Sequence, residues 1–262
     1  MTAVPLIAYA HVAKTFDDGR VVAVDDVSLE VAEGEFLAIV GGSGSGKTTL
    51  LRLTNRLIEA DGGTVTVEGE DVRNVDPIPL RRRIGYVFQS GGLFPHLSVA
   101  GNVGITPKLL GIPAAEISAR VDELLDLVRL DRTQYRDRLP HELSGGQRQR
   151  VGVARALAAK PRIVLMDEPF GALDPLTRDA LGDDFRELHR KLGLTTVMIT
   201  HDMTEAILLA DRIAVMRGGR LLAEGTPAEL SRSGDTYVGE LLRTPRRQAE
   251  RLGALLPREG AA

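Results

Sequence analysis

Three short hydrophobic runs stand out along the chain, and each is followed by glycine or polar residues. The runs cover residues 36–40 (FLAIV), 163–166 (IVLM) and 195–200 (TTVMIT). Continuous hydrophobic runs of this length are typical of parallel strands that are buried on both faces. Open parallel sheets bind ligands beyond the carboxyl ends of their strands, so the residues after these runs are the first candidates for a functional site.

Shorter β-rich runs near both ends of the chain predict antiparallel structure. From Ile7 to Val31 such runs alternate with turn residues, which predicts an antiparallel sheet segment. Later in the chain, residues 213–216 and 220–225 flank Gly218 and Gly219, a pattern typical of a β-hairpin.

Helical patterns occupy much of the remaining sequence. A helix is expected from Thr48 to Ile58, directly after the first hydrophobic run. Hydrophobic residues at helical spacing predict an amphipathic helix over Ala114–Leu130. A further helix is expected over Arg148–Lys160, because Pro161 would end it, and another in the Arg-rich tail from Arg243.

These patterns predict one α/β domain with two additions. The domain is expected over residues 1–235, with a helical subdomain inserted at about residues 90–160. Residues 236–262 are expected to form only a short helical tail. A chain of 262 residues is long enough for a sizeable core of this kind.

Composition narrows the possible functions. The net charge is −3 and the basic residues are dispersed, so we expect no nucleic-acid partner. The chain has no cysteine, which rules out disulfides and thiolate metal sites. It also has no hydrophobic stretch of roughly 20 residues, so we expect any work at a membrane to require partners that span it.

A glycine-rich segment follows the first hydrophobic run and matches the pattern G-x-x-x-x-G-K-[ST]. Glycines allow successive backbone N–H groups to face a phosphate, and the following helix adds the positive end of its dipole. Lys47 supplies a charge for the β- and γ-phosphates, and the Thr48 hydroxyl is a ligand for Mg²⁺. We therefore expect ATP and Mg²⁺ to bind at Gly41, Gly42, Ser43, Gly44, Ser45, Gly46, Lys47, Thr48 and Thr49.

Two carboxylates follow the second hydrophobic run. Asp167 is expected to hold Mg²⁺, directly or through water, and Glu168 to polarise the attacking water. Alone, such a pair is more often a solvated turn, but the phosphate loop upstream favours the catalytic interpretation.

The segment Leu143–Gln147 (LSGGQ) precedes a predicted helix and resembles the signature of ATP-binding-cassette (ABC) ATPases. Other motifs of that family occur in the same order: an adenine-stacking aromatic residue, a lid glutamine, a D-loop and a switch histidine. The resemblance spans about residues 6–230. By this resemblance, the motif residues outside the phosphate loop are Phe16, Gln89, Ser144, Gly145, Gly146, Gln147, Asp174 and His201.

The resemblance implies an α/β P-loop NTPase core with an N-terminal antiparallel β subdomain and an inserted α-helical subdomain. It also implies a homodimer of two cassettes docked head to tail, so that Ser144 and Gly146 of one face the γ-phosphate bound by the other. Gln89 would sense the γ-phosphate and contribute to the metal site with Thr48 and Asp167. His201 would bond the γ-phosphate, and the catalytic residues would be Glu168, His201, Gln89 and Lys47.

Residues 84–99 and the tail segment 241–248 are similar to the glycine betaine, carnitine and choline importer subfamily. This implies transmembrane permease subunits and an extracytoplasmic substrate-binding protein as partners, at the cytoplasmic face of the membrane. An amino-acid or methionine importer is the alternative, and a non-transport ABC ATPase is a further one. Longer members of the subfamily carry CBS modules, which we do not expect after residue 235.

Two details qualify the family pattern. Gly42 replaces the proline often found at that position, and we expect this to loosen the loop slightly without removing a ligand. The histidines at 11, 96, 141 and 189 lack metal-ligand spacing and are expected to be ordinary surface or packing residues.

A P-loop kinase or GTPase is a competing interpretation of the phosphate loop. It would leave Leu143–Gln147 and His201 unexplained.

Overall fold

The computed structural model describes residues 5–89 and 91–255. Its centre is a six-stranded sheet in the order β10-β9-β3-β8-β7-β6. Strands β6, β7, β8, β3 and β9 are parallel, and β10 pairs with β9 in the antiparallel direction. The strands are β3 (Phe36–Val40), β6 (Ile84–Val87), β7 (Ile163–Asp167), β8 (Thr195–Thr200), β9 (Arg212–Arg217) and β10 (Arg220–Gly225).

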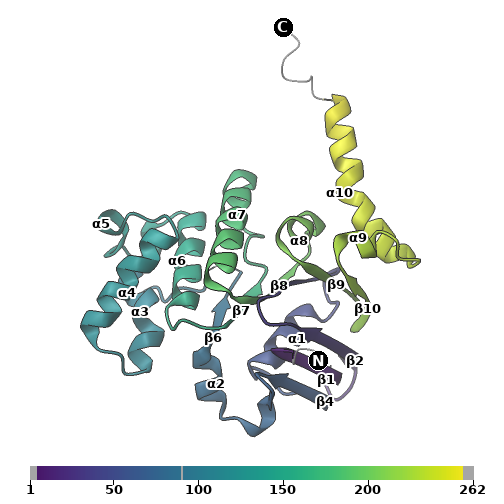
Figure 1. Cartoon of the computed structure of the whole chain (residues 1–262), viewed down its shortest axis with the longest axis horizontal. Coiled ribbons are helices and arrows are strands. Elements are labelled where there is room, and N and C mark those ends of the chain that lie inside the picture. The colour runs from purple at the N-terminus through teal and green to yellow at the C-terminus, as the bar shows by residue number, and fades with distance from the viewer. Residues whose placement is uncertain (1–4, 90, 256–262) are drawn as a thin grey trace.

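The central strands are buried on both faces. In β3 every residue is buried: Phe36, Ala38 and Val40 face one hydrophobic cluster, while Leu37 and Ile39 face the other. Because side chains alternate along a strand, a continuous hydrophobic run is what a strand between two packed layers requires. Figure 1 shows α7 and α8 on one side of the sheet, and α1 with the antiparallel sheet on the other.

The antiparallel sheet has four strands in the order β2-β1-β4-β5. Its hydrophobic side chains belong to the same cluster as Leu37 and Ile39 of β3, which also contains Leu50 and Leu51 of α1. The strands are β1 (Ile7–Phe16), β2 (Val21–Val31), β4 (Gly62–Val67) and β5 (Glu70–Asp71), and α1 is Lys47–Thr54.

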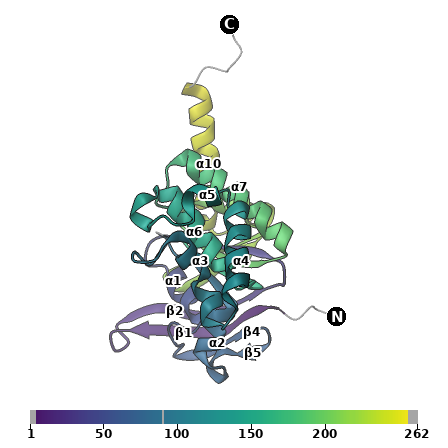
Figure 2. The same ribbon diagram turned by 90° about the vertical axis from the view of Figure 1, so that its left-hand side faces the viewer.

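A group of helices extends from the end of β6 and lies beside the sheet (Figures 1 and 2). Of these, α6 packs on α3, α4 and β6, so it connects the helical part to the core. This region contains α3 (Val99–Leu109), α4 (Ala114–Leu127), α5 (Arg132–Tyr135), the 3-10 helix η2 (Pro140–Glu142) and α6 (Gly145–Leu157). A 3-10 helix and a short helix precede β6: η1 (Val72–Asn74) and α2 (Pro77–Arg83).

The C-terminal part of the described chain contains four helices. The helices are α7 (Pro175–Leu192), α8 (Met203–Leu209), α9 (Pro227–Leu230) and α10 (Thr236–Leu255). Helix α10 contacts α8 and α9 near its start and then projects away from the body in both views (Figures 1 and 2). In the part of the chain that the structure describes, no helix is long and hydrophobic enough to cross a membrane.

The predicted fold class is confirmed: a parallel α/β core carries an N-terminal antiparallel sheet and a helical insertion. Several predicted helix ends were wrong. Helix α1 ends at Thr54 instead of Ile58, since Arg56 turns with a φ of 53°. Helix α4 ends at Leu127 instead of Leu130, before Arg129 with a φ of 57°.

The helix predicted over Arg148–Lys160 also has different ends. Helix α6 begins at Gly145, because Ser144 caps its N-terminus, and it ends at Leu157. In the tail, α10 begins at Thr236, which is the first residue of the predicted helical tail and lies seven residues before Arg243. Ser90, at the start of the predicted insertion, lies outside the described residues.

Candidate functional site

The glycine-rich loop lies between β3 and α1, as the sequence predicts. Gly46 is the N-cap of α1 and has a φ of 97°, a left-handed conformation that favours glycine. A Cβ atom at Gly46 would lie 2.0 Å from the carbonyl oxygen of Ala23, and one at Gly41 would lie 2.2 Å from that of Met216. The loop therefore packs its backbone directly on strands β2 and β9.

Lys47 is folded into this loop. Its Nζ atom donates to the carbonyl oxygens of Gly41 at 2.8 Å and Gly42 at 2.9 Å, and to Ser45 Oγ at 3.2 Å. Burial lowers the pKa of Lys47, while the carboxylates of Glu168 and Asp167 act in the opposite direction. The loop thus surrounds a cation that can pair with the negative charge of a phosphate.

Asp167 lies next to the loop at the end of β7. Thr48 Oγ1 is 3.4 Å from Asp167 Oδ1, and the Tyr86 hydroxyl donates to Asp167 Oδ2 at 3.1 Å. Arg52 Nη2 is 3.7 Å from the same Oδ2 atom. Burial first, and then the charge of Asp167, raise the pKa of Tyr86, so its hydroxyl stays a donor.

Thr48 and Asp167 offer the kind of oxygen ligand that Mg²⁺ prefers, and these two residues would hold the ion beside the phosphate loop. Gln89, which the sequence also assigned to the metal, contacts Glu168 instead of Asp167 in this structure. The described residues contain no group of three or more His, Cys, Asp or Glu side chains that could hold a metal ion.

Glu168 follows Asp167, and its carboxylate contacts two other side chains. Gln89 Nε2 donates to Glu168 Oε2 at 3.1 Å, and His201 Nδ1 lies 3.2 Å from the same oxygen. The backbone of Glu168 has a φ of 45°, and its N–H donates to the carbonyl oxygen of Ile199 at 3.0 Å. A positive φ at a residue other than glycine is strained and persists only where the surrounding structure holds it. Such residues cluster at functional sites.

The loop that carries His201 is also braced. Thr200 Oγ1 donates to the buried Glu205 at 2.6 Å and accepts from the N–H of Asp202 at 3.0 Å. Burial raises the pKa of Glu205. Asp202 in turn caps the N-terminus of α8. The turn between β8 and α8 is therefore fixed by side chains on both sides of His201.

Gln89 lies in a segment that α6 holds. Gln149 Nε2 donates to the carbonyl oxygen of Phe88 at 3.2 Å. Arg155 donates to the carbonyl oxygens of Gly91 at 2.8 Å and Gly92 at 2.7 Å. Both side chains are buried within α6, and sequence reasoning did not single them out. The sequence gives little indication that these two side chains are buried, because polar residues in a helix are usually exposed.

Ser144, Gly145, Gly146 and Gln147 form the start of α6. Ser144 Oγ accepts from the N–H of Gln147 at 3.2 Å, and Gln147 Oε1 accepts from the N–H of Ser144 at 2.9 Å, which makes a capping box. In residues 5–89 and 91–255, no hydrogen bond or ion pair joins this segment to the phosphate loop of the same chain.

The remaining predicted residues are Asp174, Phe16, Ser43 and Thr49. Asp174 caps α7 by accepting from the N–H of Thr177 at 3.0 Å, and hydrogen bonds from Thr177 lower the pKa of Asp174. Phe16 ends β1 with 39% of its surface exposed, and Lys14 Nζ lies 5.5 Å from its ring centre. Ser43 is exposed and Thr49 is half-buried.

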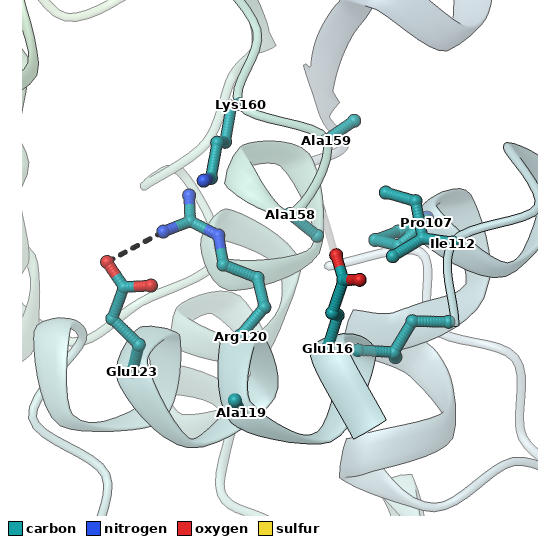
Figure 3. A pocket seen from close by; sticks show the side chains of 10 residues that line it. Pro107, Ile112, Glu116, Ala119, Arg120, Glu123, Ala158, Ala159 and Lys160 are labelled. Carbon is teal, nitrogen blue, oxygen red and sulfur yellow. Dashed lines mark ion pairs between the residues drawn. The ribbon is translucent and has the colours of Figure 1, made fainter. Parts of the chain in front are cut away.

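A separate pocket of about 390 Å³ lies between α4 and the end of α6 (Figure 3). Figure 3 shows Arg120 within it, paired with Glu123 at 2.8 Å, and Lys160 beside it. None of the predicted site residues lines this pocket. The candidate nucleotide site is instead the open surface formed by the phosphate loop and the strand ends.

The chain is similar to several known proteins. The family model described as ABC transporter matches residues 24–171. The chain is 48% identical over 238 residues to the choline transport ATP-binding protein OpuBA of Bacillus subtilis, covering 90% of this chain and 62% of that protein. It is also 48% identical over 234 residues to the glycine betaine uptake system ATP-binding protein YehX of Escherichia coli, covering 89% and 75%.

One further relative is named for a different solute, and solved structures of similar cassettes exist. The sulfate/thiosulfate import ATP-binding protein CysA 2 of Agrobacterium fabrum is 48% identical over 229 residues, covering 86% of this chain and 65% of that protein. Among solved structures, the ATP-binding cassette MJ0796, as a dimer bound to ADP and Pi, superposes with a TM-score of 0.76 at 34% identity. That match covers 84% of this chain and 98% of the other. The chain therefore belongs to the ABC transporter family and has the fold of an ATP-binding cassette.

Proposed function

We propose that this chain binds Mg-ATP at Gly41–Thr49 and hydrolyses it. The observation that carries the proposal is the position of Glu168, held by Gln89 and His201 at the strand ends beside the phosphate loop. A carboxylate so placed can orient a water molecule toward a γ-phosphate bound by Lys47. The exposed ring of Phe16 is available to stack on the adenine.

Thr48 and Asp167 would hold Mg²⁺. When bound, this ion neutralises negative charge on the β- and γ-phosphates. The protein residues then have separate tasks. Lys47 and the loop N–H groups bind the phosphates, Glu168 accepts a proton from the water, and His201 keeps Glu168 in place. Gln89 would link the γ-phosphate to the helical part, since α6 holds its segment.

We further propose that two copies complete each other's sites. Ser144 caps α6 and Gly146 lies in its first turn, and the N–H groups at the N-terminus of a helix can bind a phosphate oxygen. Among the described residues, no hydrogen bond or ion pair joins this segment to the phosphate loop of the same chain, so the loop of a second chain is the proposed partner. ATP between two such surfaces would hold them together, and hydrolysis would release them.

The proposed cellular role is to energise an importer of quaternary ammonium osmoprotectants such as glycine betaine, choline and carnitine. Relatives named for choline and glycine betaine support it. The chain would act at the cytoplasmic face of the membrane with transmembrane permease subunits and an extracytoplasmic substrate-binding protein. A sulfate/thiosulfate relative has the same 48% identity, so identity in the cassette does not select the solute.

The test is ATP hydrolysis by this chain after reconstitution with its cognate membrane subunits and substrate-binding protein. Glycine betaine, choline and carnitine would be compared with methionine, other amino acids and sulfate. Stimulation by a quaternary ammonium solute is expected. Stimulation only by another solute would keep the ATPase and overturn the substrate, and no coupled activity with verified partners would favour a non-transport ABC ATPase. A Glu168→Gln complex serves as the control that assigns the hydrolysis to this chain.

A further inference from the structure

A hydrogen bond joins the tail helix α10 to the phosphate loop. The N–H of Gly42 donates a hydrogen bond to the hydroxyl oxygen of Tyr237 at 3.2 Å, across 195 residues of sequence. Tyr237 is the second residue of α10. The expected loosening of the loop by Gly42 is thus opposed by a contact that the sequence did not reveal.

This contact acts on the same peptide group that Lys47 uses. The N–H of Gly42 and the carbonyl of Gly41 belong to one planar peptide unit, so the orientation of one fixes the other. Lys47 Nζ donates to that Gly41 carbonyl oxygen at 2.8 Å. Tyr237 and Lys47 therefore hold opposite ends of a single peptide in the phosphate loop.

Tyr237 is itself held in place by the body of the protein. The guanidinium of Arg217, at the end of β9, lies 4.7 Å from the centre of the Tyr237 ring. The next residue, Val238, is fully buried in the hydrophobic cluster that contains Phe36 and Val40 of β3. The side chain of Asp235 accepts from the N–H of Val238 at 3.0 Å. The first turn of α10 is thereby fixed, and the Tyr237 hydroxyl with it.

We propose that Tyr237 is a positioning residue for nucleotide binding, which couples the seating of α10 to the geometry of the phosphate loop. By accepting from Gly42, it keeps the Gly41 carbonyl directed at Lys47 before the nucleotide arrives. Without it the peptide can rotate, and binding must then also order the loop, which costs affinity. The inference rests on the proposed binding of nucleotide at this loop.

The experiment compares Mg-ATP affinity of the full chain with that of Tyr237→Phe, by equilibrium titration with a fluorescent ATP analogue and by KM. Loss of one hydrogen bond should raise Kd about two- to tenfold, with kcat changed less and the thermal midpoint retained. An unchanged or lower Kd would overturn the inference. Absence of binding by the unsubstituted chain would instead overturn the proposed function.

A double-mutant cycle separates this role from simple attachment of the tail. Gly42→Pro removes the donor, so adding Tyr237→Phe to it should change Kd no further. Gly42→Ala keeps the N–H, and its Cβ would lie at 3.7 Å from the Tyr237 hydroxyl, an ordinary contact. Tyr237→Phe should therefore retain its effect in the Gly42→Ala background. Equal effects in both backgrounds would contradict the proposed hydrogen bond.

Two further measurements keep the test independent of how well Gly42→Pro folds. Amide exchange at Gly42 in the nucleotide-free chain should accelerate in Tyr237→Phe, and equal exchange rates would count against the inference. Arg246→Ala, in the projecting part of α10, removes an ion pair with Glu250 far along the helix from Tyr237. It should leave both Kd and the Gly42 exchange rate as they are.

Discussion

The Nδ1 atom of His201 lies 3.2 Å from Oε2 of Glu168, although the two residues follow different strands of the central sheet. Strands β7 and β8 are parallel neighbours, with Asp167 opposite Ile199. Their carboxyl ends therefore meet at one edge, and the residue after each strand can reach the other. The register of two buried strands thus sets the geometry on which the proposed hydrolysis depends.

Glu168→Gln should keep nucleotide binding and abolish turnover. The amide retains the shape of the side chain and can still contact His201 and Gln89, but it cannot accept a proton from water. We expect hydrolysis to fall at least about 100-fold, the usual contribution of a general base. Steady-state phosphate release and equilibrium ATP binding would be measured on the same preparation.

The variant should also accumulate as an ATP-bound dimer on size-exclusion chromatography, because hydrolysis would no longer separate the two copies. Near-normal phosphate release would refute Glu168 as the base. Loss of ATP binding together with turnover would show instead that the substitution damaged the loop.

Ser144→Ala should impair hydrolysis in the partner's site and lower stability. Ser144 caps α6, so the substitution is expected to cost about 1 kcal/mol of unfolding free energy. Its effect in trans is tested by mixing Ser144→Ala protein with Lys47→Ala protein. Each mixed dimer contains one site with neither lesion, so activity should reappear. Complete inactivity of mixed dimers, with their formation demonstrated, would contradict the head-to-tail arrangement.

Much of this site could be predicted because its motifs are local. The phosphate loop needs only a strand, glycines and a helix start in succession, and the hydrophobic runs at 36–40 and 195–200 indicated two of the buried strands that meet there. Fixed motif order was enough to assign Gln89 and His201. The structure adds that both side chains contact Glu168, which motif order alone does not indicate.

Contacts that depend on sheet order were not predictable in this way. Tyr86 reaches Asp167 because β6 pairs with β7, yet β6 is a run of only four residues that includes a glycine. The bond between Tyr237 and Gly42 joins residues 195 positions apart, and no local pattern places α10 against the loop. Helix starts also depended on side-chain caps, as Ser144 shows for α6.

Gly46→Ala should destabilise the protein more than an alanine at another glycine of similar conformation. Gly46 has a φ of 97°, and a Cβ there would lie 2.0 Å from the backbone of Ala23. Gly34 has a φ of 76° with nothing within 4 Å, so Gly34→Ala carries only the conformational cost, about 1 kcal/mol. We expect Gly46→Ala to lose about 2 kcal/mol or more in urea unfolding. Equal losses would show that the loop moves freely away from β2.

His189 should make the stability of the fold depend on pH. Its ring is buried in α7, where Nδ1 lies 3.0 Å from Thr196 Oγ1 and the ring centre 5.1 Å from that of Phe36. Burial lowers the pKa of His189 below its ordinary value of 6.5, and the charge of Arg186 adds to this while Asp211 opposes it.

Because the folded pKa is depressed, the unfolded chain takes up the His189 proton first as pH falls. The stabilising contribution of the neutral ring is therefore complete above pH 6.5 and is lost as pH falls through the folded pKa. Urea unfolding of the unsubstituted chain and of His189→Gln between about pH 8 and about pH 5 would measure it. The advantage of the unsubstituted chain should shrink toward the acid end. A constant difference across that range would mean that the buried ring does not titrate as proposed.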